Sequence, residues 1–197
     1  MNNKKSILIT GFNPFGPYAI NPTESLINWL SAQKINADCV FKVLPTEFEN
    51  AGKKLEDLLT TKQFDLAIHF GLSEKAKKIM LEKVALNYIF NRLPDNSGKC
   101  YDGVAIRSDE PDAIMTALPV EAIIKNDDRF DLSLSAGSYV CNYIYFLSSL
   151  MLGKEKGRSL FVHVPATVEM QERFTYSQQQ INSGCLDLIN KLILRLE

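Results

Sequence analysis

The sequence has 197 residues, a formal net charge of −1 and a charged fraction of 23%. This balance leaves no basic surplus for binding nucleic acid, and the apolar run near the N-terminus is too short for a signal peptide or a membrane span. The chain is long enough for one sizeable core but short for two domains, so we expect a single domain over residues 1–197, in the cytoplasm.

Cysteine and histidine are scarce and scattered along the chain. The four cysteines show no Cys-x-x-Cys spacing, so we expect free, buried and inert thiols at those that carry no chemistry. They are Cys39, Cys100, Cys141 and Cys185. The two histidines, His69 and His163, argue against a histidine-rich metal site and leave two candidate bases for a reaction of a thiol.

The N-terminal half alternates short apolar runs with amphipathic segments. Residues 6–10, 39–44 and 64–71 are apolar runs that end at glycine or proline, which predicts strands. Residues 21–30 and 48–59 have the apolar spacing of helices. This alternation predicts an α/β fold, a three-layer αβα domain whose mainly parallel, mixed central sheet is covered on both faces.

A loop rich in glycine and proline follows the first predicted strand. Residues 11–17 place Phe12 and Phe15 at the end of that strand, where α/β proteins bind ligands. The loop lacks the Gly-Lys-Ser/Thr ending and the Gly-x-Gly-x-x-Gly spacing of nucleotide sites. From the residues alone, we expect both phenylalanines in the core.

Two polar residues interrupt apolar segments in the middle of the chain. His69 lies inside the predicted strand 64–71, where a lone histidine is expected to be packed and hydrogen-bonded to the backbone. Glu82 lies in the segment 75–87, which is compatible with either a helix or a strand. Its apolar neighbours alone favour a half-exposed element with Glu82 in solvent.

The C-terminal half begins with a long irregular stretch. Residues 92–111 are polar and rich in turns, and we expect them to cover a site or contact another subunit. Residues 112–125 predict a mixture of helix and turn. Residues 130–135 and 158–165 predict strands, and residues 177–196 predict a closing helix.

The segment 135–151 carries the candidate nucleophile, Cys141. Small residues lead into a helical apolar pattern, which puts the cysteine in the first turn of a buried helix. The N–H groups and the dipole at a helix N-terminus favour a thiolate and a developing oxyanion. His163 lies near the end of a predicted strand, and Glu82 could reach the same edge of the sheet. These residue types permit a Cys–His–Glu triad without requiring one.

Several motifs resemble the pyroglutamyl-peptidase I (pyrrolidone-carboxylate peptidase) family, in the same order and over essentially the whole chain. They are residues 9–16 with 21–22, 93–98, 136–142 and 161–165. In addition, Glu82 begins Glu-Lys-Val-Ala-Leu-Asn where the family has Glu-Arg-x-Ala-x-Asn.

The resemblance implies removal of an N-terminal pyroglutamyl residue from peptides, on a phosphorylase- or hydrolase-like fold. It implies that Cys141 attacks the acyl carbonyl, that His163 transfers the proton to the leaving amine, and that Glu82 holds the imidazolium. It also implies that no metal or organic cofactor takes part and that the protein assembles as a homotetramer.

The resemblance also implies a substrate pocket. Phe12 and Phe15 would enclose the flat pyrrolidone ring, Asn21 would shape their loop, and Val140 would lie beside the nucleophile. A small neutral lactam needs apolar faces and a few amide partners, which suits such a pocket.

One segment departs from the family pattern. Where the family has Gly-Gly-Arg, this chain has residues 74–76, with Ala76 at the arginine position, so we expect a changed pocket geometry or charge. Lys75, Lys77 or Lys78 could restore charge but not the planar guanidinium. The departure leaves two alternatives: the same triad acting on another small N-acyl substrate, and a homologue that binds ligands without turnover. A nucleoside phosphorylase, whose fold the family resembles, lacks support because the sequence has no phosphate-binding signature.

Overall fold

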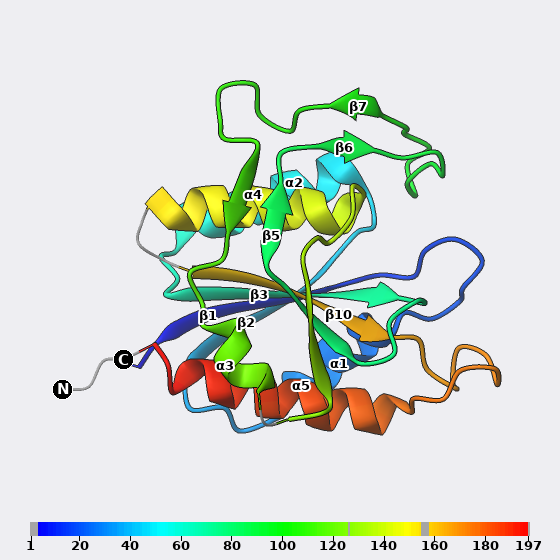
Figure 1. Ribbon diagram of the computed structural model, residues 1–197, viewed down its shortest axis with the longest axis vertical. Helices are drawn as coiled ribbons and strands as arrows, with labels where there is room; N and C mark the ends of the chain where they lie inside the picture. Colours follow the sequence, from blue (N-terminus) through cyan, green and yellow to red (C-terminus); the bar gives the residue numbers. More distant parts are fainter. Residues whose placement is uncertain (1–3, 126, 155–157, 197) are drawn as a thin grey trace.

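A computed structural model of the chain describes residues 4–125, 127–154 and 158–196. The centre of the described structure is a six-stranded sheet with the strand order β2-β1-β3-β10-β4-β9 (Figure 1). The strands are β1 (Ser6–Phe12), β2 (Asp38–Leu44), β3 (Leu66–Ser73), β4 (Ile79–Glu82), β9 (Phe130–Ser133) and β10 (Arg158–Pro165). Neighbouring strands are parallel except β4 and β10, which are antiparallel. The predicted mainly parallel, mixed sheet is confirmed.

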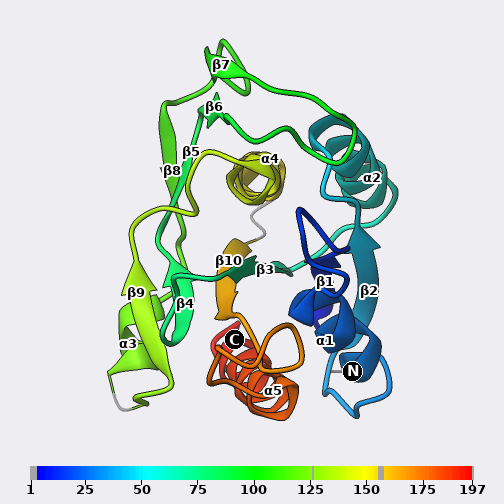
Figure 2. The ribbon, with the colours of Figure 1, turned by 90° about the vertical axis from the view of Figure 1, so that its right-hand side faces the viewer.

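Helices cover both faces of this sheet, as Figure 2 shows. They are α1 (Pro22–Leu30), α2 (Phe48–Thr61), α3 (Val120–Ile124), α4 (Val140–Lys154) and α5 (Gln178–Ile193). The alternation of side chains along β1 explains the two cores: Ile7 and Ile9 pack towards α1 and α5, whereas Leu8 and Phe12 pack towards α2 and α4. Each fully buried leucine or isoleucine contributes roughly 1.5–3 kcal/mol through removal of apolar surface from water.

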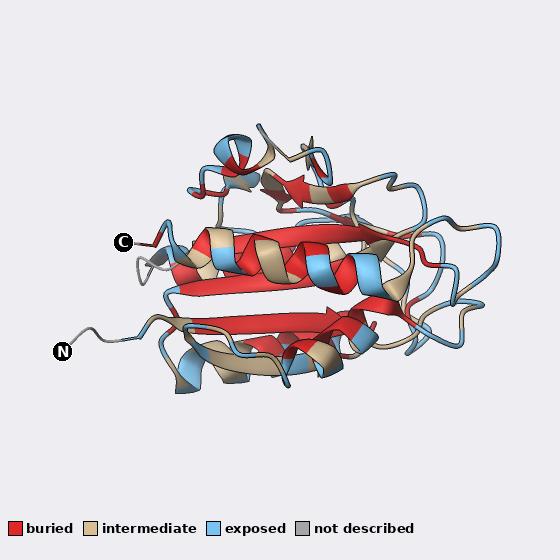
Figure 3. Ribbon diagram, turned by 90° about the horizontal axis from the view of Figure 1, so that it is seen from below, coloured by how far each residue is buried: buried red, intermediate tan, exposed pale blue. Residues whose placement is uncertain are grey.

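The inner strands β1, β3, β10 and β4 are buried along most of their length, whereas the edge strands β2 and β9 are mostly half-buried or exposed; further exposure lies on loops and on the outer faces of helices (Figure 3). This burial explains the continuous apolar runs by which the sequence predicted β1, β3 and β10. Among the described residues, no helix has the length and apolar character needed to cross a membrane.

Helix starts follow the local capping chemistry. The Asn21 side chain accepts a hydrogen bond from the backbone N–H of Thr23 at 3.0 Å, and Pro22 occupies the first helical position of α1. Ser177 and Gln180 form a capping box at the start of α5. The first described turn of α4 begins at Val140, so Cys141 lies in the first turn, as predicted.

The segment 75–87, which the sequence left undecided between helix and strand, forms β4 and then β5 (Val84–Leu86). From β5 the chain leaves the sheet and builds an arm that passes over α4 (Figures 1 and 2). In the arm, β5 pairs with β8 (Ala113–Met115), and β6 (Ile89–Phe90) pairs with β7 (Asp102–Val104), both antiparallel. Between β7 and β8 the stretch is irregular, as expected.

Asn142 fixes this arm to α4. Its side chain is fully buried. Its amide oxygen accepts a hydrogen bond from the N–H of Leu86 at 2.9 Å, and its amide nitrogen donates to the carbonyls of Leu86 and Tyr88 at 2.9 and 3.0 Å. The Asn142 side chain, one residue after the candidate nucleophile, therefore forms the backbone hydrogen bonds that a neighbouring strand would otherwise form with the free edge of β5.

We expect Asn142→Ala to lower the free energy of unfolding by roughly 2–4 kcal/mol, because it leaves buried backbone groups of β5 without partners. Urea denaturation followed by circular dichroism measures this change. Asn28→Ala, at an exposed position on α1, is the matched control and should change stability little. Equal effects of the two substitutions would show that the amide does not hold the arm.

Candidate active site

The side chains of Cys141, His163 and Glu82 come together where β3 and β10 end. Nδ1 of His163 lies 2.7 Å from Oε1 of Glu82. Cys141 acts on the His163 ring as well, because it raises the pKa of that ring. Gly71 of β3 pairs with His163 in the sheet, and a methyl group on Gly71 would lie 3.0 Å from Sγ of Cys141. The three residues singled out in the sequence thus form one cluster.

The antiparallel pairing of β4 with β10 brings the acid to the imidazole. Met80 lies opposite His163 and Glu82 lies opposite Phe161, so these side chains share the face that α4 covers. Glu82 reaches His163 along the diagonal between the strands. Its exposed fraction is 2%, so the expectation of a solvent-facing Glu82 is wrong. Glu82 is buried because α4 and the neighbouring strands cover it, and the local sequence does not reveal these neighbours.

The neighbours of His163 favour its charged form. Burial would lower the pKa of His163, but its hydrogen bonds to Cys141 and Glu82 outweigh burial and raise the pKa to about 9. An imidazolium is therefore expected at neutral pH. This cation lies beside the thiol in the first turn of α4.

A cavity of about 450 Å³ opens at Cys141 and contains both phenylalanines of the loop after β1. Phe12 is buried, as expected, yet it lines the cavity and its ring centre lies 6.2 Å from that of Phe161. Phe15 is half-buried rather than in the core, and it packs against Tyr139 with ring centres 5.1 Å apart. The cavity thus offers aromatic faces next to the thiol.

Asn21 and Val140 occupy different places relative to this cavity. Asn21 lines it and shapes the loop, because its side-chain amide donates to the carbonyl of Asn13 at 3.0 Å while its oxygen caps α1. The Val140 side chain is fully buried in the core between the sheet and α4, and it is not among the residues lining the cavity. Val140 can therefore meet a ligand only through its backbone.

Hydrogen bonds between loops hold the walls of the Cys141 cavity. The N–H of Thr46 donates to the Asn13 side chain at 2.7 Å, and the Asn96 side chain donates to the carbonyl of Pro14 at 3.0 Å. Asp95 accepts the N–H of Phe48 at 2.9 Å, at the start of α2. The irregular stretch after residue 92 thus reaches the site, in agreement with its expected role as a cover.

Sequence reasoning missed several residues that line this cavity. They are Pro17, Tyr18, Thr46, Leu72, Leu93 and Tyr139. Tyr139 and Leu93 lie in segments that resemble family motifs, and Pro17 ends the loop after the first predicted strand, so the sequence carried a signal for these three. Tyr18, Thr46 and Leu72 carried none; Leu72 lies near the end of β3, and the three meet only in the folded chain.

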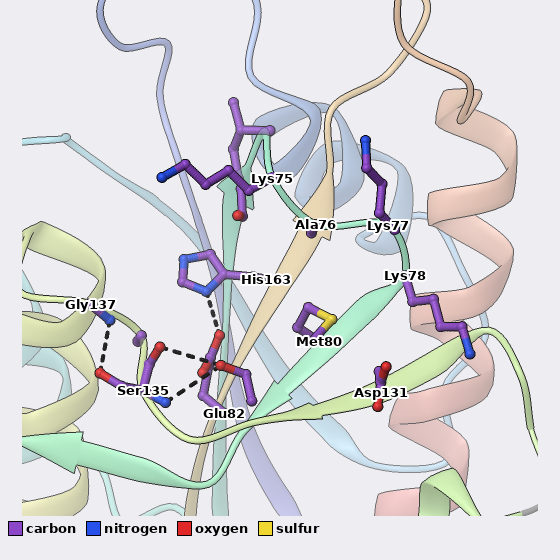
Figure 4. Close-up of a pocket in the computed structure, with 14 residues that line it drawn as sticks. Lys75, Ala76, Lys77, Lys78, Met80, Glu82, Asp131, Ser135, Gly137 and His163 are labelled. Carbon is purple, nitrogen blue, oxygen red and sulfur yellow. Dashed lines mark hydrogen bonds and ion pairs between the residues drawn. The ribbon is translucent and has the colours of Figure 1, made fainter.

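A second cavity, of about 590 Å³, is lined by His163, by Met80 and Glu82 of β4 and by the segment that follows β3 (Figure 4). His163, Glu82 and Ala76 are among the residues that line it, whereas Ala76 is not among those that line the Cys141 cavity. The segment that departs from the family pattern therefore borders both cavities, because Glu74 and Lys75 line the Cys141 cavity and bring charge to it, as expected.

The second histidine has a structural position. His69 is fully buried, and its Nδ1 lies 2.7 Å from the hydroxyl of Thr10, so its partner is a side chain rather than the expected backbone group. Burial lowers the pKa of His69 to about 3, which keeps the ring neutral. It packs below the site, with its ring centre 6.4 Å from that of Phe161.

All four cysteines are free thiols, as predicted. Cys185 is buried, and burial raises the pKa of its thiol above the usual range. Burial likewise raises the pKa of the half-buried Cys39 to about 11. Cys100 is exposed, so the expectation of a buried thiol is wrong for this residue. The reason is its position in the irregular loop of the arm. Among the described residues, no group of three or more His, Cys, Asp or Glu is arranged to hold a metal ion.

Comparisons with known proteins identify the family. The family model described as pyroglutamyl peptidase matches residues 5–189. This chain belongs to the pyroglutamyl peptidase family. The pyrrolidone-carboxylate peptidase of Pyrococcus furiosus is 40% identical over 167 residues, which cover 81% of this chain and 80% of that protein. That of Thermococcus litoralis is 35% identical over 198 residues, covering 96% and 90%.

Solved structures of family members share the fold. The pyrrolidone carboxyl peptidase of Thermococcus litoralis superposes with a TM-score of 0.89 at 32% identity, covering 97% of this chain and 94% of that one. The pyroglutamyl peptidase I of Bacillus amyloliquefaciens superposes with a TM-score of 0.90 at 26% identity, covering 98% and 99%. The family's enzymes are cysteine peptidases that remove N-terminal pyroglutamate, so the reaction class inferred from the motifs is confirmed.

We expect Gly71→Ala to slow alkylation of Cys141 by iodoacetamide on the order of 100-fold, because the new methyl group would lie 2.7 Å from the Phe161 ring and displace the thiol. Gly153→Ala is the control, since a methyl group there meets nothing within 4 Å. Mass spectrometry of the modified peptide follows both reactions. Unchanged alkylation in Gly71→Ala would show that the close approach does not position the nucleophile.

Proposed function

We propose that Cys141, His163 and Glu82 carry out the family reaction in this chain, the removal of an N-terminal pyroglutamyl residue from a peptide. The observation that supports this most strongly is the buried 2.7 Å contact between His163 and Glu82, next to a thiol that opens into an aromatic cavity. Hydrolysis through an acyl-enzyme needs a nucleophile, a base next to it and an acid that orients the base, and Cys141, His163 and Glu82 are arranged in this way.

In the first half-reaction, the Sγ thiolate of Cys141 attacks the carbonyl carbon that joins pyroglutamate to the next residue. The C–S bond forms, and the carbonyl electron pair moves to oxygen, where the N–H groups at the start of α4 stabilise the negative charge. His163 then donates its Nε2 proton to the amide nitrogen, the C–N bond breaks, and the shortened peptide leaves as an amine. A thioester on Cys141 remains.

In the second half-reaction, water cleaves the thioester. The neutral His163 takes a proton from water, the oxygen attacks the thioester carbonyl, and the C–S bond breaks to release pyroglutamic acid. The proton stays on His163 opposite the regenerated thiolate. Glu82 holds Nδ1 throughout, which keeps Nε2 directed at the reacting atoms and stabilises the imidazolium.

The Cys141 cavity suits the lactam ring. Phe12 and Phe15 offer apolar faces to a flat neutral ring, and the hydrogen bond from the Asn21 side chain to the Asn13 carbonyl helps to hold their loop in place. Ala76 lines the other cavity, whereas Glu74 and Lys75, which replace the family's two glycines, line the Cys141 cavity and add charge beside its aromatic faces. The aromatic faces still favour pyroglutamyl peptides over another small N-acyl substrate, and the complete triad argues against a protein that only binds.

We also propose that the protein acts in the cytoplasm, where free cysteines stay reduced, and that it assembles as a homotetramer, as the family resemblance implies. Met115 and Leu134 are 64% and 68% exposed, so they offer apolar surface for contact between subunits.

The triad is tested by the release of a fluorogenic amine from its pyroglutamyl amide. We expect Cys141→Ser and His163→Ala to lower kcat/KM by about 10⁴-fold or more, and Glu82→Gln to retain weak activity, because an orienting group contributes less than a nucleophile. Cys100→Ser, at the exposed thiol, should match the parent. Parental activity in Cys141→Ser would refute the proposed nucleophile.

The alkaline pH dependence tests the role of Glu82. As pH rises through the raised pKa of His163, about 9, the imidazolium loses the proton that the leaving amine requires, so kcat/KM should fall with a midpoint near that value. Glu82 helps to raise this pKa, so Glu82→Gln should move the midpoint to lower pH. The pH profile of kcat/KM measures both. An alkaline limb that does not move in Glu82→Gln would contradict the assigned role.

A further inference from the structure

The two cavities meet at the catalytic cluster. They share Leu72, Ser73 and Lys75, with Cys141 in the first cavity and His163 in the second. The acyl ring must lie on the Cys141 side, and the amine that accepts the proton of His163 must leave on the other side. The second cavity is thus placed to hold the residues that follow pyroglutamate, an assignment that rests on the proposed function.

Positive charge gathers around this second cavity. Lys75, Lys77 and Lys78 line it, and among the described residues none of the three forms an ion pair. Two carboxylates line it as well: Glu82, which His163 engages, and the exposed Asp131. The lysines therefore leave a positive surplus.

The lysines are arranged along the cavity rather than at one point. Figure 4 shows Lys75 on the side of His163, whereas Lys77 and Lys78 extend from the opposite side of the cavity. Lys75 is thus the lysine placed closest to the first leaving residue. The other two lie where residues further along the peptide would pass.

The floor of the cavity offers a partner for a peptide backbone. Oε2 of Glu82 is buried and has no hydrogen-bond partner among the described residues, while Oε1 is held by His163. An unpartnered buried carboxylate oxygen carries a considerable desolvation penalty, which a peptide N–H would relieve. Met80 adds apolar surface beside it.

We propose that the second cavity binds the leaving part of the peptide and that its lysines, Lys75 foremost, favour substrates with a carboxylate there. The carboxylate can come from an acidic side chain directly after pyroglutamate or from the C-terminus of a dipeptide. In either case it pairs with a lysine while the neighbouring backbone N–H donates to Glu82.

The test compares substrates that differ only in charge. The first pair is pyroglutamyl-glutamic acid α-amide against pyroglutamyl-glutamine α-amide, and the second is pyroglutamyl-alanine against its α-amide. Chromatography of the released amino acid or amide gives kcat/KM for each. We expect the charged member of at least one pair to be preferred by about three- to five-fold at low salt, the size of an exposed ion pair, and less at high salt.

Lysine variants assign the preference to the cavity. Lys75→Gln should lower the charged-to-neutral ratio, and the combined Lys75→Gln, Lys77→Gln, Lys78→Gln variant should bring it close to one. Lys54→Gln, an exposed lysine on α2 that lines neither cavity, is the matched control and should keep the ratio of the parent. Cleavage of the neutral substrates by each variant shows that it is folded.

The outcomes separate this inference from the proposed function. A ratio of one for both pairs in the parent, or an undiminished ratio in the triple variant, would overturn the carboxylate preference while turnover of the neutral peptides leaves the function standing. Failure of the parent to cleave any of the four peptides would instead overturn the function. A preference in the first pair assigns the carboxylate to the side chain, and one in the second assigns it to the C-terminus.

Discussion

The hydrogen bond between His163 and Glu82 is the interaction on which the site depends, and the sheet is built so that it can form. In the described six-stranded sheet, β4 and β10 are the one antiparallel pair. This pairing places Glu82 of β4 beside β10, the strand that carries His163. Because β4 begins near the edge where β3 ends, the short segment between them, residues 74–78, is enough to make this connection. Residues 75–78 of that segment also line the second cavity.

Burying an imidazolium and a carboxylate is unfavourable unless each is paired, so the surrounding structure must keep the pair in place. Helix α4 does much of this within its first turns. Cys141 supplies the second partner of the imidazole, Asn142 holds the arm, and the hydroxyl of Tyr145 donates to the backbone carbonyl of Glu82 at 2.9 Å. Cys141, the arm and Glu82 are thus fixed by neighbouring positions of one helix.

Local sequence was sufficient for elements that bury a continuous apolar run. The strand over residues 158–165 and the position of Cys141 in the first turn of a helix follow from pattern alone. Glu82 and Phe15 did not, because the surroundings of each come from distant parts of the chain; the partner of Glu82 lies 81 positions away. The strands β4 and β5 are so short that the spacing of their apolar residues fits a helix as well as a strand. Only the family motifs indicated the acid in advance.

The position of α4 has a consequence for the lifetime of the site. The helix contacts β3 and β10 of the sheet, α2 beside it, and β5 and β8 of the arm, so it is enclosed on several sides. A helix enclosed in this way is expected to open only when the structure around it opens, unlike the loops that line the cavities. Its amide protons should therefore be among the slowest to exchange with solvent. The thiol of Cys141 is then held in place for as long as the native fold persists, whereas the walls of its pocket can rearrange around it on a shorter timescale.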